Sequence, residues 1–139
     1  MKRNMIKILA SLLPVLFLLA PVAAADDAGD RVFEMRVYTA AEGKLPDLMA
    51  RFRDHTNYLF VKHGMDLIGY WTPTEGEGTG NTLVYLLAHD SREAAKKSWA
   101  GFVADPAWKA AAAESRKDGR LVAKITNQWL KPTDFSPIK

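Results

Sequence analysis

The sequence predicts an α+β domain of the ferredoxin-like kind, in which a four-stranded antiparallel sheet carries its helices on one face. Two observations lead to this prediction: segments of period-2 alternation are separated by segments of helical periodicity, and their order is β-α-β-β-α-β. The composition agrees with a globular domain, because 48% of the 139 residues are hydrophobic and 25% are charged.

The N-terminal segment has the three-part pattern of a secretory signal peptide. Three basic residues stand among the first seven, an uncharged apolar run covers residues 8–20, and three alanines precede Asp26. A membrane anchor is the alternative, but the apolar run is shorter than the ~20 residues that a bilayer span needs. We therefore expect a signal peptide over residues 1–25 and one periplasmic or secreted domain over residues 26–139, with no membrane attachment after cleavage.

The charge balance of the domain follows from this leader. The whole chain has 19 basic and 16 acidic residues, a formal net charge of +3. Lys2, Arg3 and Lys7 account for that surplus, so the remaining domain is balanced. Nucleic-acid binding needs a basic face, and we expect none here. The absence of cysteine excludes disulfides, thiolate metal sites and a cysteine nucleophile.

The first predicted strand, residues 31–39, has two different faces. Its apolar face consists of Phe33, Met35 and Val37, and its more polar face of Glu34, Arg36 and Tyr38. A helix over residues 43–63 follows, because apolar residues recur there at i, i+3, i+4 and i+7. Proline occurs only in its first turn, and Gly64 is a natural residue to follow its end.

The second half of the domain begins with a predicted β-hairpin. Residues 65–73 and 82–89 form its strands, and the glycine-rich residues 74–81 form its loop. This loop leads into a strand, whereas a dinucleotide-binding loop must open a helix, so we expect no phosphate cradle.

The rest of the second half predicts a broken helix and a last strand. Ser91 is the expected N-cap of a helix through about Val103, and Asp105-Pro106 restarts a helix that ends at Gly119. Residues 120–130 complete the sheet.

The predicted strands carry apolar side chains on both faces, unlike a sheet with one solvated face. In the second strand, the period-2 pattern places Ile68 and Tyr70 on one face and Leu67 and Trp71 on the other. In the third strand, it places Leu83, Tyr85 and Leu87 on one face and Val84 and Leu86 on the other. In the last strand, it places Ile125 and Trp129 on one face and Val122 and Leu130 on the other. The domain has no further segment to form a third layer. We therefore expect an isologous homodimer in which a partner subunit covers the free face.

Five segments, in order, resemble the NIPSNAP domain. They are FEMRVYT (residues 33–39), EGKLPDLMARF (42–52), KHGMDLIGYWTP (62–73), DPAW (105–108) and PTDFSP (132–137). The resemblance implies the dimeric α+β-barrel fold, but no reaction, because NIPSNAP domains lack an agreed biochemical activity. Related families with this fold include cofactor-independent monooxygenases, isomerases and haem enzymes, so an enzyme is expected only by analogy of fold.

The candidate catalytic residues are Arg36, Tyr38 and His63. Arg36 is suited to orient an anionic or carbonyl-bearing substrate, and Tyr38 to donate a hydrogen bond or act as a weak acid. The alternative is a structural ion pair of Arg36 with Glu34 and a tyrosine at the dimer interface. His63 has three interpretations: a general base, an axial haem ligand, or a residue that caps its helix.

The candidate ligand-binding residues are Glu34, Tyr70, Trp71 and Tyr85, which would line a cavity for a small aromatic or carbonyl-bearing molecule. The alternative for the aromatic residues is packing in the core or the interface. A metal site is not expected, because His55 and His63 lie about 12 Å apart along one helix and cannot share an ion. No cofactor is expected either.

Two functions are consistent with these patterns. The first is a small-molecule enzyme, such as a cofactor-independent monooxygenase or an isomerase, with its cavity between sheet and helices. The second is a non-catalytic binding or protein-interaction module.

Overall fold

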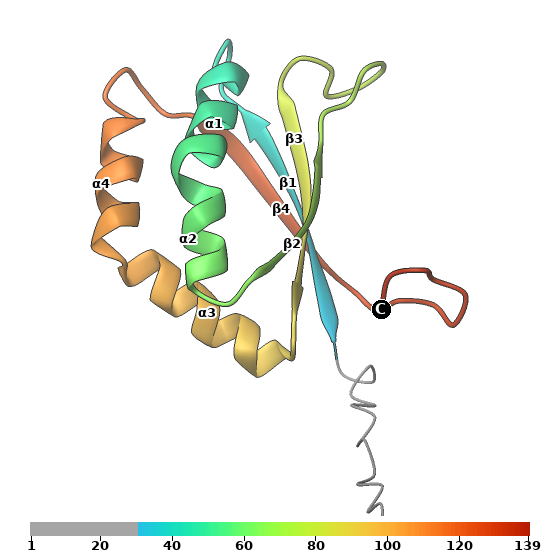
Figure 1. Ribbon diagram of the computed structural model, residues 1–139. Helices are drawn as coiled ribbons and strands as arrows, with labels where there is room; N and C mark the ends of the chain where they lie inside the picture. Colours follow the sequence, from blue (N-terminus) through green and yellow to red (C-terminus); the bar gives the residue numbers. More distant parts are fainter. Residues whose placement is uncertain (1–30) are drawn as a thin grey trace, which may run out of the picture.

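The computed structural model describes residues 31–139 and has the predicted order of elements (Figure 1). The strands are β1 Val32–Ala40, β2 Asp66–Trp71, β3 Thr82–His89 and β4 Val122–Leu130. The helices are α1 Leu45–Arg51, a π-helical turn Phe52–Thr56, α2 Asn57–Lys62, α3 Arg92–Ala104 and α4 Pro106–Glu114. The predicted signal peptide lies outside the described residues. Among those described, no helix is long and apolar enough to span a bilayer.

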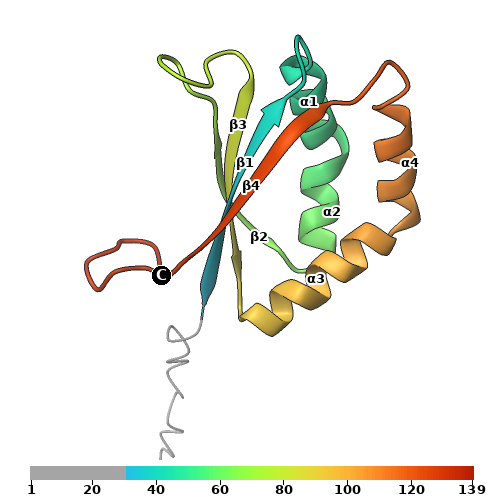
Figure 2. The same cartoon turned by 180° about the vertical axis from the view of Figure 1, so that it is seen from behind.

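The four strands form one antiparallel sheet in the order β2-β3-β1-β4. Within residues 31–139, all helices lie on one face of this sheet, and the opposite face carries only the C-terminal tail (Figures 1 and 2). This arrangement confirms the predicted ferredoxin-like fold. The predicted faces of β1 are also correct, because Glu34 contacts Trp99 of α3 while Phe33 contributes to a groove beside the C-terminal tail.

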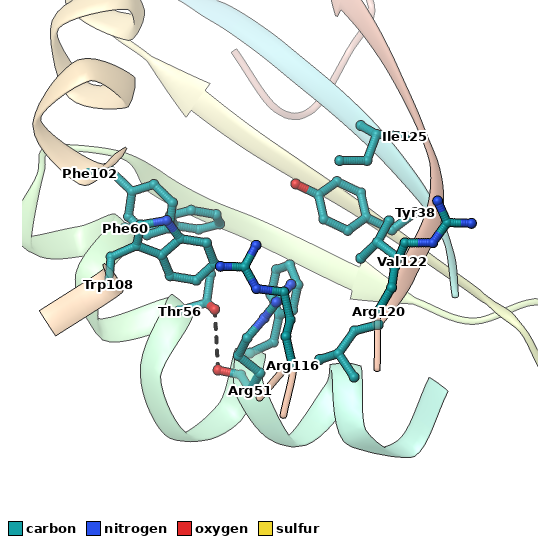
Figure 3. Close-up of a pocket in the computed structure, with 12 residues that line it drawn as sticks. Tyr38, Arg51, Thr56, Phe60, Phe102, Trp108, Arg116, Arg120, Val122 and Ile125 are labelled. Atoms are coloured by element: carbon teal, nitrogen blue, oxygen red, sulfur yellow. Dashed lines mark hydrogen bonds between the residues drawn. The ribbon is translucent and has the colours of Figure 1, made fainter. Parts of the chain in front are cut away.

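The helix predicted over residues 43–63 is interrupted by the π-helical turn, which the apolar periodicity did not reveal. Its Thr56 hydroxyl donates a hydrogen bond to the carbonyl of Arg51 at 3.2 Å (Figure 3). Turns of this kind occur frequently at functional sites. Arg51, directly before this turn, and Phe52 and Thr56 within it are all buried.

The broken second helix follows the predicted capping. The Ser91 hydroxyl accepts a hydrogen bond from the backbone N–H of Ala94 at 3.0 Å, and Asp105 Oδ1 accepts one from Ala107 at 2.8 Å. Helix α4 ends at Glu114, five residues before Gly119, and turns connect it to β4.

The core lies between the sheet and the helices and is rich in aromatic side chains. The Tyr85 ring is fully buried at its centre, 5.2 Å from the Tyr38 ring and 5.1 Å from the Phe52 ring. One predicted face is wrong: Leu67 and Tyr70 both pack against this core, although strict period 2 placed them on opposite faces. The cause is a register shift in β2 between Leu67 and Gly69.

Candidate functional site

A cavity of about 290 Å³ opens between the sheet and the helices, at the end of the sheet near α1 and α4 (Figure 3). Its lining comes from β1, the interrupted helix, α3, α4, the segment that leads into β4 and β4 itself. The lining residues are Tyr38, Arg51, Phe52, Thr56, Phe60, Phe102, Trp108, Arg116, Arg120, Leu121, Val122 and Ile125.

Most of the cavity wall is apolar and aromatic. The Trp108 ring lies 4.4 Å from the Phe102 ring, and the Tyr38 ring meets the Phe52 ring edge-on at 5.9 Å. In Figure 3 the hydroxyl of Tyr38 is directed toward the side where Phe102 and Trp108 lie. The wall therefore offers flat apolar surfaces with two hydroxyls among them, that of Tyr38 and that of Thr56, which donates to the carbonyl of Arg51.

Three arginines interrupt this apolar lining. Arg51 is buried, with only 8% of the residue exposed, whereas Arg116 and Arg120 are exposed. The Arg51 guanidinium lies 5.2 Å from the centre of the Trp108 ring, and its Nη1 is 3.4 Å from the Ser115 hydroxyl. Its buried Nε has no hydrogen-bond partner.

The electrostatics of Arg51 reflect this setting. Burial lowers the pKa of Arg51, the nearby charge of Arg116 lowers it further, and the phenol groups of Tyr38 and Tyr85 oppose the shift. Arg116 is itself held by a hydrogen bond from its Nε to the carbonyl of Ala112 at 2.7 Å. The positive charges of Arg51 and Arg116 thus repel one another beside the cavity. In Figure 3 the Arg120 guanidinium is directed outward, away from both.

Of the predicted catalytic residues, only Tyr38 lines the cavity. Arg36 shares its strand face, but its guanidinium lies 4.3 Å from the centre of the Trp99 ring and donates to Glu34 at 2.9 Å. The structure therefore contains the Arg36–Glu34 ion pair of the structural alternative. Tyr38 faces the helices, so it does not lie on the free face where a partner subunit was expected.

Glu34 is fully buried and accepts four hydrogen bonds from four different elements. Oε1 accepts from Arg36 Nη1 at 2.9 Å and from Asn127 Nδ2 at 2.7 Å. Oε2 accepts from His89 Nε2 at 3.2 Å and from Trp99 Nε1 at 2.7 Å. Burial alone would raise the pKa of Glu34, but these hydrogen bonds and the charge of Arg36 outweigh it and lower the pKa. Glu34 thus joins β1, β3, β4 and α3, and both of its oxygens are occupied within the protein.

His63 ends α2 and lies apart from the residues that line the cavity. Its Nε2 lies 2.7 Å from Asp105 Oδ2, the same oxygen that accepts a hydrogen bond from Lys62 Nζ at 2.7 Å. Hydrogen bonds from Lys62, His63 and the Ala107 backbone hold the pKa of Asp105 well below its usual range. The backbone N–H of His63 bonds the last carbonyls of α2, whereas its side chain contacts Asp105 and so ties the end of α2 to the start of α4.

The other predicted ligand-binding residues are not part of the cavity lining. Tyr85 and Tyr70 pack in the core with their rings stacked 5.6 Å apart, and both hydroxyls lack a hydrogen-bond partner. Burial raises the pKa of each of these tyrosines. Trp71 follows Tyr70 in β2, is 55% exposed and lies over Gly69.

The residues that sequence reasoning missed are Arg51, Arg116 and Arg120. Arg51 follows the buried Leu48 by three positions on α1, so helical spacing places it beside the apolar stripe, and contacts with Trp108 and Ser115 from the other half of the chain bury it. Arg116 and Arg120 lie in the connection after α4, where no periodicity applies. Within residues 31–139, no three His, Asp or Glu side chains converge in a way that could hold a metal ion.

Comparisons with known proteins identify a family and several solved structures that this chain resembles. The sequence profile of the NIPSNAP family matches residues 33–137. A NIPSNAP family protein of unknown function from Agrobacterium tumefaciens has 25% identity and a TM-score of 0.69, over 79% of this chain and 95% of that one. A NIPSNAP-like domain protein from Burkholderia xenovorans has 22% identity and a TM-score of 0.67, over 77% and 89% of the two chains.

A more distant structural relative is SnoaB, a cofactor-independent oxygenase from Streptomyces nogalater. Its identity is 15% and its TM-score 0.53, over 78% of this chain and 98% of that one, so the likeness shows a shared fold. The comparison with curated proteins finds no match. Because the family profile covers nearly all the described residues and the fold agrees, this chain belongs to the NIPSNAP family.

Proposed function

We propose that this NIPSNAP domain binds a small, largely apolar organic molecule in the cavity between its sheet and its helices. The observation that carries the proposal is the cavity itself, about 290 Å³ with walls that are mainly apolar and include five aromatic rings. An apolar cavity of about 150 Å³ holds one benzene molecule, so this volume suits a body of about two fused rings. Its size lies near the lower end of the range for small-molecule sites, about 300–1,000 Å³.

The proposal is tested by blocking the cavity. Ile125 lines it and is 49% exposed, so Ile125→Trp adds bulk at the opening without inserting a ring into the closed core. The matched control is Val103→Trp, because Val103 is 57% exposed on α3 and does not line the cavity. We expect titration calorimetry with 2-naphthalenemethanol and 2-naphthoate to show binding of at least one probe to the wild type and to Val103→Trp, but not to Ile125→Trp. Absence of binding by both probes to the wild type would contradict the proposal.

A narrower proposal is that the bound molecule reacts in the cavity, as the substrate of a cofactor-independent monooxygenase or an isomerase. Tyr38 supports it, because its hydroxyl is available to hold a carbonyl or phenol oxygen of the ligand. In the oxygenase case, O₂ oxidises a ring CH₂ to C=O, one oxygen atom enters the product, and the other leaves as water. Oxygen uptake and product mass, compared between wild type and Tyr38→Phe, test this. Binding without turnover of any bound compound supports the alternative, a non-catalytic binding or interaction module.

We also propose a homodimer and an exported location. The support for the dimer is the face of the sheet opposite the helices, which carries Val37, Val84 and Leu86 and, among the described residues, is covered only in part by the C-terminal tail. The support for export is the signal-like pattern of residues 1–25. Mass spectrometry of the intact protein from the secreted or periplasmic fraction tests the exported location. The expected mass is that of a chain that begins at Asp26.

A further inference from the structure

We propose that the molecule held in the cavity is an organic acid, an aromatic carboxylate whose carboxylate pairs with Arg51 while its rings contact Trp108 and Tyr38. This inference rests on the proposed function and specifies the chemical class of the ligand.

The first argument is that Arg51 is a buried cation without a counter-ion. It is only 8% exposed, and within residues 31–139 every ion pair joins other residues. A buried charge is costly unless an opposite charge or several hydrogen bonds compensate it. The contacts that Arg51 does make, to the Trp108 ring and at 3.4 Å to a hydroxyl, compensate it only in part.

Neighbouring acids do not fill this role. The other side of Arg51 borders a shallow surface groove that contains four carboxylates, those of Asp47, Asp54, Glu114 and Asp118. None of them forms an ion pair with Arg51. Asp47 pairs with Lys44 at 3.1 Å, and Glu114 pairs with Lys117. The lining of the cavity itself contains no acidic residue.

The second argument is the geometry of the available donors. A guanidinium is a planar fork that binds a carboxylate through two parallel hydrogen bonds, and the Nε of Arg51 is buried and unpartnered. The Tyr38 hydroxyl lines the same cavity and is a further donor. The aromatic walls then hold the body of the ligand, so the cavity is polar at one point and apolar elsewhere.

The third argument is the nearby charge of Arg116. This second cation lowers the pKa of Arg51, as burial does, which means that the two positive charges repel one another beside the cavity. An anion bound between them relieves the repulsion. A phosphate monoester would satisfy the same two cations, but the planar fork of the one buried guanidinium matches the two oxygens of a carboxylate.

The test compares three probes on the mature protein by titration calorimetry at neutral pH. They are 2-naphthoate, its neutral counterpart 2-naphthalenemethanol, and 2-naphthyl phosphate. We expect 2-naphthoate to bind about ten-fold or more tightly than the alcohol, as a charge-assisted pair predicts. In Arg51→Met, which keeps the apolar stem, we expect this preference to disappear while the affinity for the alcohol changes less than about two-fold.

Two variants keep the test decisive. The matched control is Arg53→Met, which removes an exposed charge two residues away and should leave the preference unchanged. If Arg51→Met does not fold, Arg116→Met removes the exposed second cation and should reduce the preference by about three-fold.

The other outcomes overturn the inference. If 2-naphthoate and 2-naphthalenemethanol bind with equal affinity and Ile125→Trp abolishes the binding of both, the cavity binds small molecules but does not select acids. If the phosphate binds about ten-fold more tightly than the carboxylate and depends on Arg51, the ligand is a phosphoryl anion. If no probe binds, the proposed function fails together with this inference.

Discussion

At the scale of single residues, Glu34 is the most constrained polar group in the described chain. Its carboxylate is fully buried, and each of its oxygens accepts two hydrogen bonds. Both oxygens of the carboxylate are satisfied, although Arg36 Nε and His89 Nδ1, on two of its partners, are buried without a hydrogen-bond partner. A donor left without an acceptor keeps its full cost of desolvation, so loss of the carboxylate would leave further groups unpaired. Glu34 therefore holds the orientation of Arg36 and Trp99 near the cavity without belonging to its lining.

Replacing Glu34 by Gln tests this role. Glutamine offers one acceptor oxygen where the carboxylate offers two, and its amide nitrogen would face two of the present donors. We expect Glu34→Gln to reduce the free energy of unfolding by about 3 kcal/mol, measured by urea denaturation. Asp66→Asn is the control, because it breaks the exposed pair with Arg31 and should cost less than about 1 kcal/mol. Equal losses in the two variants would contradict the structural role of Glu34.

The same residue predicts a pH dependence. Because the folded state lowers the pKa of Glu34 below its ordinary value of 4.5, its contribution to stability is present above that value and is lost as pH falls through the folded pKa. We expect the stability difference between wild type and Glu34→Gln to be constant near neutral pH and to shrink below about 4.5. Urea denaturation across this range measures it, and a difference that grows toward acid would have the wrong sign.

At the scale of elements, α2 and α3 approach closely at Gly101. A Cβ atom at this position would lie 2.7 Å from Nδ1 of His63, which is closer than side chains normally come. His63 has little freedom to move away, because its other ring nitrogen contacts Asp105 at 2.7 Å. Gly101 is thus required by packing, although glycine inside a helix is otherwise unfavourable.

A double-mutant cycle tests this packing. In the wild type, we expect Gly101→Ala to reduce the free energy of unfolding by about 1–2 kcal/mol, because the added methyl group forces the helices apart. In a His63→Ala background the methyl group has space, and the same substitution should instead stabilise by up to about 1 kcal/mol through helix propensity. Additive effects in the cycle, measured by urea denaturation, would show that the two residues are not in contact.

At the scale of the whole molecule, the two faces of the sheet differ in what covers them. In the part of the chain that the structure describes, the helices cover one face, and the tail after β4 covers only part of the other, where it borders a groove with Phe33, Leu86 and Leu130. The middle of this second face is formed by Val37 of β1, with Val84 of β3 and Thr126 of β4 directly beside it. An apolar surface of this kind is a natural interface between two copies.

A charge at the centre of this surface should separate the copies. We expect the wild type to sediment with twice the mass of the chain at micromolar concentration, and Val37→Glu to sediment as a monomer, because an unpaired carboxylate cannot be buried in the interface without a large penalty. Val103→Glu, which places the same charge on the exposed side of α3, should leave the mass unchanged. A monomeric wild type would contradict the homodimer.

Local patterns determined most of the fold. Period-2 alternation placed the two faces of β1, and the side chains of Ser91 and Asp105 located the starts of α3 and α4, because each of these signals depends only on residues a few positions apart. The predicted strand over residues 82–89 coincides with β3. The register shift in β2 was missed, because it depends on pairing with β3 and not on the residues of β2 alone.

The candidate site depended far more on tertiary structure. The sequence placed Tyr38 on the face that lines the cavity, but it also grouped Tyr38 with His63, which lies at the junction of α2 and α4. It could not place Arg51 beside Arg116, because these residues are 65 positions apart and meet only when the end of α4 packs beside α1. The chain's local chemistry thus determined the elements and their faces, whereas the cavity and its buried cation arose from long-range packing, which no short segment encodes.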